Sequence, residues 1–163
     1  MIDVNVNESP MLRFQTPNPD FADRVRASFA RQAFMAHIGA LLSDIAPGRC
    51  EIDLPYREEL TQQHGFFHGG IIGTLADNAC GYAAFTLAPA DASILTVEYK
   101  MNIVSPGDGE RLVARAEIVR PGRSLVVCRG DVYAVKNGTE KLAATALATM
   151  MLMHGREDDR SGG

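Results

Sequence analysis

Cysteine is scarce in this chain, and the spacing of its three cysteines excludes two common uses of the residue. Cys50, Cys80 and Cys128 are odd in number and far apart, which does not suit the disulfide framework of a small secreted domain. The sequence also lacks a Cys-x-x-Cys pair or any other metal spacing. We therefore expect reduced thiols in a cytoplasmic protein that uses no metal and no other cofactor.

Positive charge is in slight deficit, with 16 Lys and Arg against 20 Asp and Glu. The net charge of −4 has the wrong sign for nucleic-acid binding, and the basic residues are scattered along the chain. The N-terminus lacks a basic segment followed by an apolar run, so we expect no signal peptide. The composition therefore predicts a protein that binds neither nucleic acid nor a membrane.

A single domain is predicted between two polar ends. Residues 1–19 are polar and rich in Pro and Asn, which indicates a flexible N-terminal arm, and residues 154–163 form a polar tail. The domain itself spans residues 20–153. It begins with a helix from about Phe21 to His37, for which Asp20 is the expected N-cap. The apolar stripe of this helix consists of Phe21, Val25, Phe29, Ala33 and Ala36.

The region after Pro89 changes to a period of two, which predicts strands with one buried face. In the first strand, Leu95, Val97, Tyr99, Met101 and Ile103 alternate with polar residues. Further strands are expected over about 49–54, 111–118, 124–135 and 141–153. Two turns are marked by Pro121-Gly122, where Gly would supply a positive φ, and by the hairpin signal Asn137-Gly138. At least five strands should form an antiparallel sheet, whose edges favour pairing with a second subunit.

The longest apolar run, Gly69 to Leu87, has an ionisable residue at its centre. Its length approaches that of a membrane span, but Asp77, Asn78 and the two opening glycines argue against one. A buried helix in a soluble protein is the better interpretation. Because helix and sheet each need an apolar partner, we predict an α+β fold in which the sheet wraps around this helix.

Asp77 is the first candidate for chemistry, because a buried carboxylate is costly unless it is paired or functional. Gly69 and Gly70 begin the helix, where unpaired backbone N–H groups and the positive end of the dipole can stabilise an oxyanion. The glycines could equally serve only to permit a sharp turn. Asp77 could likewise be a structural acid that caps or bridges a subunit interface.

The spacing of these groups predicts an active site shared between subunits. Eight residues separate Gly69 from Asp77, which is roughly 12 Å along a helix. That is too far for both groups to reach one reacting centre. Two antiparallel helices related by a two-fold axis would bring the Gly69 end of one next to Asp77 of the other.

Other residues of this segment have both a functional and a structural interpretation. His68 either takes part in the site or caps the helix and fixes the loop. Gln62 either holds a water or a carbonyl group or lies on the surface, and Phe67 either walls an acyl pocket or packs in the core. His64 and His68 have the spacing of a helical metal pair, but no HExxH glutamate accompanies them, so this indication is weak.

Residues 64–85 (HGFFHGGIIGTLADNACGYAAF) and 95–134 together resemble the PaaI-like branch of the hotdog-fold acyl-CoA thioesterases. The resemblance covers about residues 36–153. It is carried by His68-Gly69-Gly70, Asp77 nine residues after the histidine, the strand Val97 to Asn102 and the turn Pro121-Gly122-Arg123. It implies a hotdog fold, hydrolysis of an acyl-CoA thioester, and a homodimer joined edge to edge that is usually doubled to a homotetramer.

The resemblance also implies roles for individual residues. Asp77 would be the general base or the nucleophile, and the N–H of Gly69 or Gly70 would polarise the thioester carbonyl. His68 would hold the loop, and Gln62 would orient water or substrate. The implied substrate contacts are Phe67, Asn78, Gly122, Arg123 and Ser124. Attack by water with Asp77 as base and a covalent anhydride at Asp77 both remain open.

Two rival functions and one question stay open at this point. A hotdog dehydratase is disfavoured, because the sequence lacks an Asp four or five residues before a His. An acyl-CoA binding module without turnover would share the fold, as would a purely structural dimer. The N-terminal extension, up to about residue 35, lies outside the resemblance and covers either the acyl pocket or another subunit.

Overall fold

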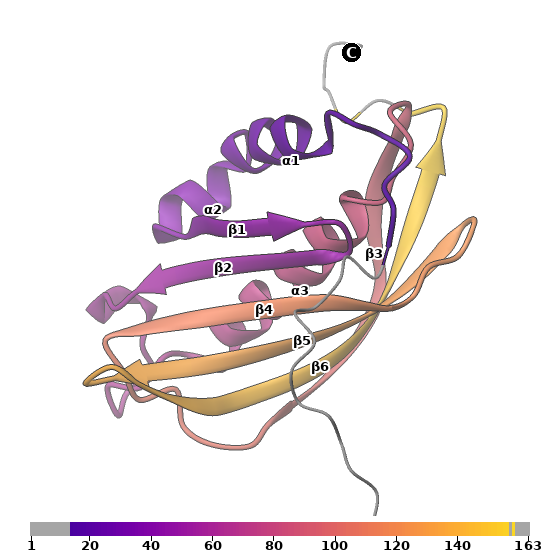
Figure 1. Cartoon of the computed structure of the whole chain (residues 1–163). Helices are drawn as coiled ribbons and strands as arrows, with labels where there is room; N and C mark the ends of the chain where they lie inside the picture. Colours follow the sequence, from indigo (N-terminus) through magenta and orange to yellow (C-terminus); the bar gives the residue numbers. More distant parts are fainter. Residues whose placement is uncertain (1–13, 157, 159–163) are drawn as a thin grey trace, which may run out of the picture.

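The structure, a computed structural model, describes residues 14–156 and residue 158. One antiparallel sheet wraps around a long helix (Figure 1). In chain order the elements are α1 (Phe21–Ala30), α2 (Ala33–Ile38), β1 (Leu41–Ala46), β2 (Arg49–Pro55), the 3₁₀ helix η1 (Glu58–Leu60), α3 (Gly69–Phe85), β3 (Ala92–Ile103), β4 (Arg111–Arg120), β5 (Leu125–Lys136) and β6 (Thr139–His154). The strand order is β1-β2-β4-β5-β6-β3. The predicted α+β hotdog architecture is confirmed.

The helix α3 lies in the centre of the core because its residues and those of the facing sheet are small. Ala76, Ala79 and Ala83 are fully buried on the helix. On β5, a Cβ added at Gly130 would lie 2.9 Å from Cys80 Sγ and 3.2 Å from the Ala76 carbonyl oxygen. The backbones therefore approach each other more closely at this point than any larger residue would allow.

The three cysteines belong to this core and are free thiols, as expected. Burial raises the pKa of Cys80 and of Cys50, and it raises the pKa of Cys128 to about 12. Protonated, enclosed thiols of this kind are poor nucleophiles. The cysteines therefore contribute packing and are no part of a reactive site.

The single N-terminal helix expected from Phe21 to His37 is wrong, because the chain forms α1 and α2 with a break at Arg31 and Gln32. Gln32 has extended backbone geometry (ψ 94°), and its side-chain amide donates a hydrogen bond to Tyr82 Oη on α3. The break changes which side chains after it face the core: Met35 and Ile38 are buried, whereas Ala33 and Ala36, which belong to the predicted apolar stripe, are exposed. Asp20 occupies the N-cap position of α1 but makes no side-chain capping hydrogen bond.

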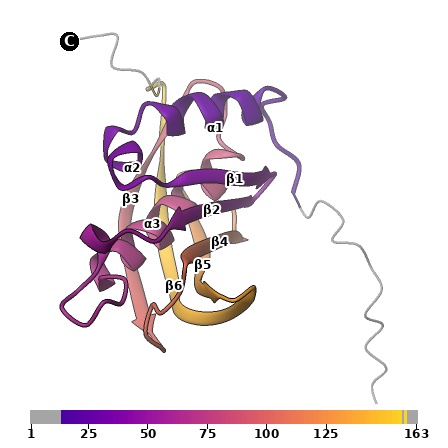
Figure 2. The ribbon, with the colours of Figure 1, turned by 90° about the vertical axis from the view of Figure 1, so that its left-hand side faces the viewer.

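The helix α1 spans the gap between the two ends of the curled sheet. It contacts β1 and α3, and the Arg24 guanidinium donates hydrogen bonds to the carbonyl of Pro89 and to that of Ala92, the first residue of β3. Figure 2 shows α1 and α2 beside β1. Within the expected flexible arm, residues 14–19 lie against the domain, since Thr16 Oγ1 donates to the Thr86 carbonyl over 2.7 Å. Residues 1–13 of that arm, and most of the tail, lie outside the described residues.

The five predicted strands are confirmed, and β1 is an additional one that the period-two pattern missed. Its sequence, LLSDIA, does not alternate, and its pairing with β2 shifts register between Leu42 and Asp44. The Asn137-Gly138 hairpin between β5 and β6 is confirmed, with φ values of 51° and 73°. The positive φ expected at Gly122 is wrong. Glycine is needed there for another reason, because a Cβ would lie 2.1 Å from the Leu125 carbonyl oxygen.

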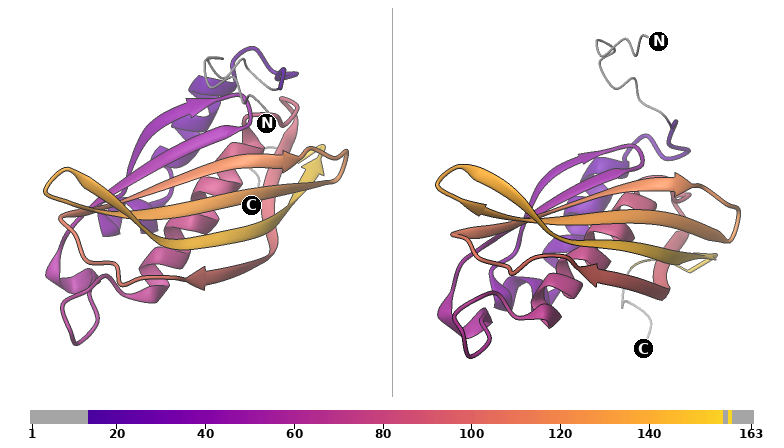
Figure 3. Two further views of the ribbon diagram at one scale, coloured as in Figure 1. Left: turned by 60° about the horizontal axis from the view of Figure 1, so that its bottom comes forward. Right: turned by 90° about the horizontal axis from the view of Figure 1, so that it is seen from below.

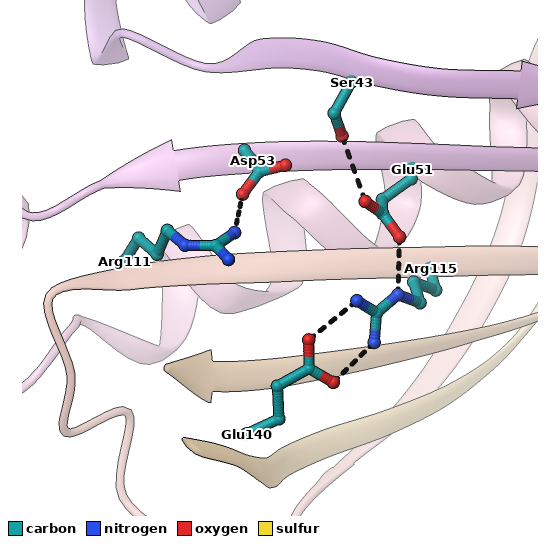
Figure 4. A network of polar contacts seen from close by, with 6 residues as sticks. All are labelled: Ser43, Glu51, Asp53, Arg111, Arg115 and Glu140. Atoms are coloured by element: carbon teal, nitrogen blue, oxygen red, sulfur yellow. Dashed lines mark hydrogen bonds and ion pairs between the residues drawn. The ribbon is translucent and has the colours of Figure 1, made fainter. Parts of the chain in front are cut away.

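The outer face of the sheet carries an ion-pair network (Figure 4). Arg115 on β4 donates to Glu51 on β2 and makes two hydrogen bonds to Glu140 on β6, at 2.6 and 2.7 Å. Arg111 pairs with Asp53 alongside it. The guanidinium of Arg115 lowers the pKa of Glu140. The charged side chains of this network are paired with one another on the outer face of the sheet. Asp77, the candidate for chemistry, lies on α3, which packs against the opposite face.

The strand β3 is one of the two edges of the sheet, since it pairs with β6 alone (Figure 3), and the other edge, β1, is contacted by α1. Leu95, Val97, Tyr99 and Ile103 on this strand are 44–55% exposed. The simple alternation predicted for residues 95–103 is wrong, because the register shifts between Thr96 and Glu98. The bulge places Thr96, as well as Tyr99 and Ile103, against α3.

Candidate active site

Asp77 projects from the middle of α3 toward β3. Thr96 Oγ1 donates a hydrogen bond of 2.7 Å to Asp77 Oδ1. The carboxyl group is half-buried, and this burial raises its pKa, while the hydrogen bond from Thr96 opposes the rise. A carboxyl group whose pKa is moved toward neutrality, yet is held by one donor, suits proton transfer.

Thr96 is a site residue that the sequence pattern did not reveal. By strict alternation it belongs to the polar, outward set of its strand. The bulge at Val97 reverses the phase, so Thr96 faces the helix, while Glu98 on the other side of the bulge lies opposite Thr149 of β6 and accepts a hydrogen bond from it. Bulges often re-aim side chains beside functional sites, and only the backbone register reveals this one.

The backbone N–H groups of Gly69 and Gly70 at the start of α3 differ in their hydrogen bonding. His68 is the N-cap, and its Nδ1 accepts a hydrogen bond of 2.9 Å from the Gly70 N–H. The capping role considered for His68 is therefore present. Among residues 14–156 and 158, nothing accepts a hydrogen bond from the Gly69 N–H. The Gly69 N–H is thus the donor available to a ligand oxygen at the positive end of the helix.

A cavity of about 420 Å³ lies at this helix start. Its lining includes Gln62, Phe66, Phe67, Gly69, Ile103 and Pro106. Gln62 Oε1 accepts a hydrogen bond from the His64 N–H over 2.6 Å, so Gln62 shapes the loop as well as facing the cavity. Phe67 is buried and packs edge-on against Tyr56, with ring centroids 5.6 Å apart. The structure therefore brings Gln62, Phe67 and Gly69 together around one space.

Asp77 belongs to a second cavity, of about 160 Å³, between α1, α3 and β3. Asn78 lines it as well. The Asn78 Nδ2 group donates to the Thr74 carbonyl over 3.3 Å, whereas its buried Oδ1 has no hydrogen-bond partner among the described residues. An unsatisfied buried acceptor is costly unless a further group supplies a donor. Asn78 Oδ1 is therefore available to accept a hydrogen bond from a ligand, so Asn78 stays a candidate substrate contact.

The two cavities are separate in one chain. Gly69 and Asp77 both lie in α3, roughly 12 Å apart along its axis at the usual helical rise. The turn Gly122-Arg123-Ser124 lies elsewhere, because the Arg123 carbonyl contacts His154 at the end of β6, where β6 pairs with the start of β3. Gly69 lies beside Ile103 at the other end of β3. One protomer therefore does not bring the predicted residues together.

Neither cavity contains a set of ligands for a metal. In the part of the chain that the structure describes, no three His, Cys, Asp or Glu side chains are grouped to hold a metal ion. His68 Nδ1 accepts a hydrogen bond from the Gly70 N–H, so this nitrogen is already engaged, which weakens further the indication of a His64–His68 metal pair.

Replacement of Thr96 by Val is expected to shift the acid limb of the pH–rate profile to higher pH. The hydrogen bond from Thr96 lowers the pKa of Asp77, so its loss should raise that pKa further and keep the carboxyl protonated over a wider range. The measurement is kcat/KM against pH. Thr149→Val removes a similar hydroxyl–carboxylate contact from the outer face and should leave the profile in place. An unchanged profile for Thr96→Val would mean that Asp77 does not titrate in turnover.

Comparisons with known proteins identify relatives over most of the chain. A profile of the Thioesterase superfamily matches residues 64–141. A thioesterase family protein from Silicibacter pomeroyi is 50% identical, with a TM-score of 0.82, over 83% of this chain and 99% of that one. Human acyl-coenzyme A thioesterase 13 is 30% identical over 112 residues, which are 68% of this chain and 78% of that protein.

The fold alone also matches the Escherichia coli PaaI protein, with a TM-score of 0.75 at 18% identity over 85% of this chain and 96% of that one. None of the helices among the described residues has the length and apolar character needed to cross a membrane. The sequence identity, the coverage and the fold all relate this chain to thioesterases. The chain therefore belongs to the thioesterase superfamily and has the hotdog fold of its PaaI-like members.

Proposed function

We propose that the protein is an acyl-CoA thioesterase, in which Asp77 acts on the thioester and the Gly69 end of α3 binds the carbonyl oxygen. The observation that carries the proposal is the half-buried Asp77, with its raised pKa and the hydrogen bond from Thr96, on a helix whose first N–H has no acceptor among the residues that the structure describes. Both groups that acyl transfer requires are thus supplied by α3. Membership of the thioesterase superfamily supports hydrolysis of a thioester.

The chemistry follows from these two groups. The thioester oxygen accepts a hydrogen bond from the Gly69 N–H, which stabilises the charge that develops when the carbonyl carbon is attacked. In one route, Asp77 removes a proton from water as the new C–O bond forms, and the proton reaches the CoA sulfur as the C–S bond breaks. In the other, the Asp77 carboxylate attacks the carbonyl carbon and forms an anhydride as the C–S bond breaks and CoA leaves as its thiolate; water then hydrolyses the anhydride to the free acid and regenerates Asp77. His68 keeps the helix start in place, and Gln62 orients the water or the carbonyl.

The two halves of the site come from different subunits in this proposal. The exposed edge of β3 suits antiparallel pairing with β3 of a second copy, since its unpaired backbone groups and apolar side chains would both be satisfied. A two-fold axis there would also set the two α3 helices antiparallel, with Gly69 of one facing Asp77 of the other. Such dimers would pair further into a dimer of dimers.

The CoA portion of the substrate is assigned to the turn at Gly122, Arg123 and Ser124. The Arg123 side chain is exposed and makes no ion pair among the described residues, so it is available for a phosphate group. Because this turn lies near the start of β3, whereas Gly69 of the same chain lies at the other end of that strand, its contact with the substrate also depends on the assembly.

The test is release of the CoA thiol from a panel of short, medium and aromatic acyl-CoAs by the purified protein. We expect release from at least one substrate at more than 10³ times the rate of spontaneous hydrolysis, which is modest for an enzyme. A folded dimer that binds these acyl-CoAs without releasing thiol would contradict the proposal and would indicate a binding module.

A further inference from the structure

The N-terminal helix and the break after it form one side of the cavity that contains Asp77. Ser28 and Gln32, from α1 and the break that follows it, line one side of it, and Tyr82 and Phe85 of α3 line the floor. Ile94, Leu95 and Thr96 of β3 form the remaining wall. The region before residue 36, which has no counterpart in the family resemblance, thus supplies part of this pocket.

The end of the cavity away from Asp77 is polar. Gln32 Nε2 donates to Tyr82 Oη over 2.9 Å, and Ser28 Oγ lies 3.2 Å from the same oxygen. Tyr82 is only 5% exposed and Ser28 only 8%. Three polar side chains therefore lie at this end of the pocket, and two of them are buried where apolar residues would pack at lower cost.

These groups keep hydrogen-bonding capacity that the protein does not use. A phenol oxygen takes part in up to three hydrogen bonds, and two are made here. Gln32 keeps one N–H and its carbonyl oxygen, for which no acceptor or donor is found within the described ranges. The cluster can therefore both donate to and accept from a ligand oxygen.

The cavity also limits the size of its occupant. Its volume is about 160 Å³, and a cavity of about 150 Å³ holds one benzene ring. Five residues separate Asp77 from Tyr82, which is roughly 7.5 Å along the helix, or the length of about six carbons. Gly81 leaves the floor open between them, since a Cβ there would only reach van der Waals contact, 4.0 Å from Ile94.

Charge in the pocket disfavours an anionic occupant. Asp77 and Asp158 both line it. Two guanidinium groups lie nearby, and both already have partners: Arg31 pairs with Asp158 at 2.8 Å, and Arg24, 4.1 Å from the Phe85 ring centroid, donates to the carbonyls of Pro89 and Ala92. A terminal carboxylate would therefore meet two acidic side chains and guanidinium groups that are already engaged.

We propose that this cavity is the acyl pocket and that it selects a short acyl group, about six carbons long, with a neutral hydroxyl or carbonyl oxygen at its far end, which Tyr82, Gln32 and Ser28 bind. The inference rests on the proposed thioesterase function, because it assigns the acyl group that Asp77 acts on. It also gives the N-terminal helix a role within its own subunit, as the wall that sets specificity.

The test compares three CoA thioesters that differ only at the far end: hexanoyl-CoA, 6-hydroxyhexanoyl-CoA and adipoyl-CoA. For the wild type we expect kcat/KM for the hydroxylated substrate to exceed that for hexanoyl-CoA by about tenfold. Adipoyl-CoA should be the poorest of the three. Tyr82→Phe should bring the ratio of hydroxylated to plain substrate close to one, and Gln32→Leu should act in the same direction.

Tyr133→Phe is the matched control, because Tyr133 lies beside Arg115 on the outer face and loses the same hydroxyl group. This variant should keep the wild-type ratio. Activity on all three substrates with equal kcat/KM, or a ratio that Tyr82→Phe and Gln32→Leu leave unchanged, would overturn the pocket assignment while the thioesterase function stands. Absence of thiol release from every acyl-CoA would instead remove the function on which it rests.

Discussion

Replacement of Asp77 by Asn is expected to lower kcat for thioester hydrolysis by about 10²–10⁴-fold, the usual contribution of a positioned acid–base group. Asn keeps the size of the side chain and can still accept the hydrogen bond from Thr96. It cannot take a proton from water or attack a carbonyl carbon. The loss should therefore appear in kcat, measured by thiol release with the best substrate of the panel, while acyl-CoA binding survives.

The same variant should be more stable than the wild type at neutral pH. Burial raises the pKa of Asp77 above the ordinary value of 3.8, so the native state binds this proton more tightly than the unfolded chain does. Stability is then lost as pH rises through the folded pKa. Asp77→Asn should raise Tm by about 1–3 °C at pH 7, and this difference should vanish below about pH 3.8.

Asp44→Asn provides the control, since Asp44 is an exposed carboxylate on β1, remote from α3. We expect it to change neither kcat nor the pH dependence of Tm. A folded Asp77→Asn protein with more than a tenth of the wild-type kcat would contradict the catalytic role. Loss of activity accompanied by a lower Tm at pH 7 would point to a structural acid instead.

Two inactive variants, Asp77→Asn and Gly69→Val, are expected to restore activity to each other when they form mixed dimers. In a shared site, the Gly69 end comes from one subunit and Asp77 from the other. A heterodimer therefore has one site with both changes and one site with neither. Random exchange of equal amounts should recover about a quarter of the wild-type activity, whereas each variant alone should lose at least about 10²-fold.

Gly69→Val is suitable because the added Cβ would lie 3.1 Å from the Ile103 Cδ1, a flexible methyl group that can move. The side chain would then obstruct approach to the Gly69 N–H. Two different affinity tags allow the heterodimer to be isolated and its thiol release to be measured directly. The double variant Asp77→Asn/Gly69→Val, mixed with wild type, is the control, because its heterodimers contain no intact site. An isolated heterodimer of the two single variants that stays inactive would place the whole site within one chain.

The sequence alone determined the features that depend on local pattern. The long apolar run with Asp77 predicted the central helix, and the sheet was expected from the period of two and from the Asn137-Gly138 hairpin, which needs positive φ at both residues. The glycines at the helix start and the spacing of Gly69 and Asp77 led to the prediction of a site shared between subunits, which stays a prediction. These signals lie within a few residues of one another, so no knowledge of the fold was required.

Only the tertiary structure decided the contacts between distant segments. Thr96 reaches Asp77 because a bulge shifts the register of β3 against β6, and pairing between strands 50 residues apart does not follow from the alternation of one strand. Gln32, in the break between α1 and α2, donates a hydrogen bond to Tyr82, 50 residues away, which helix periodicity alone could not reveal. Local propensity predicts most helices and strands, whereas tertiary packing decides where a helix breaks and which polar residues face the cavity, because those choices depend on the free energy of the whole assembled core.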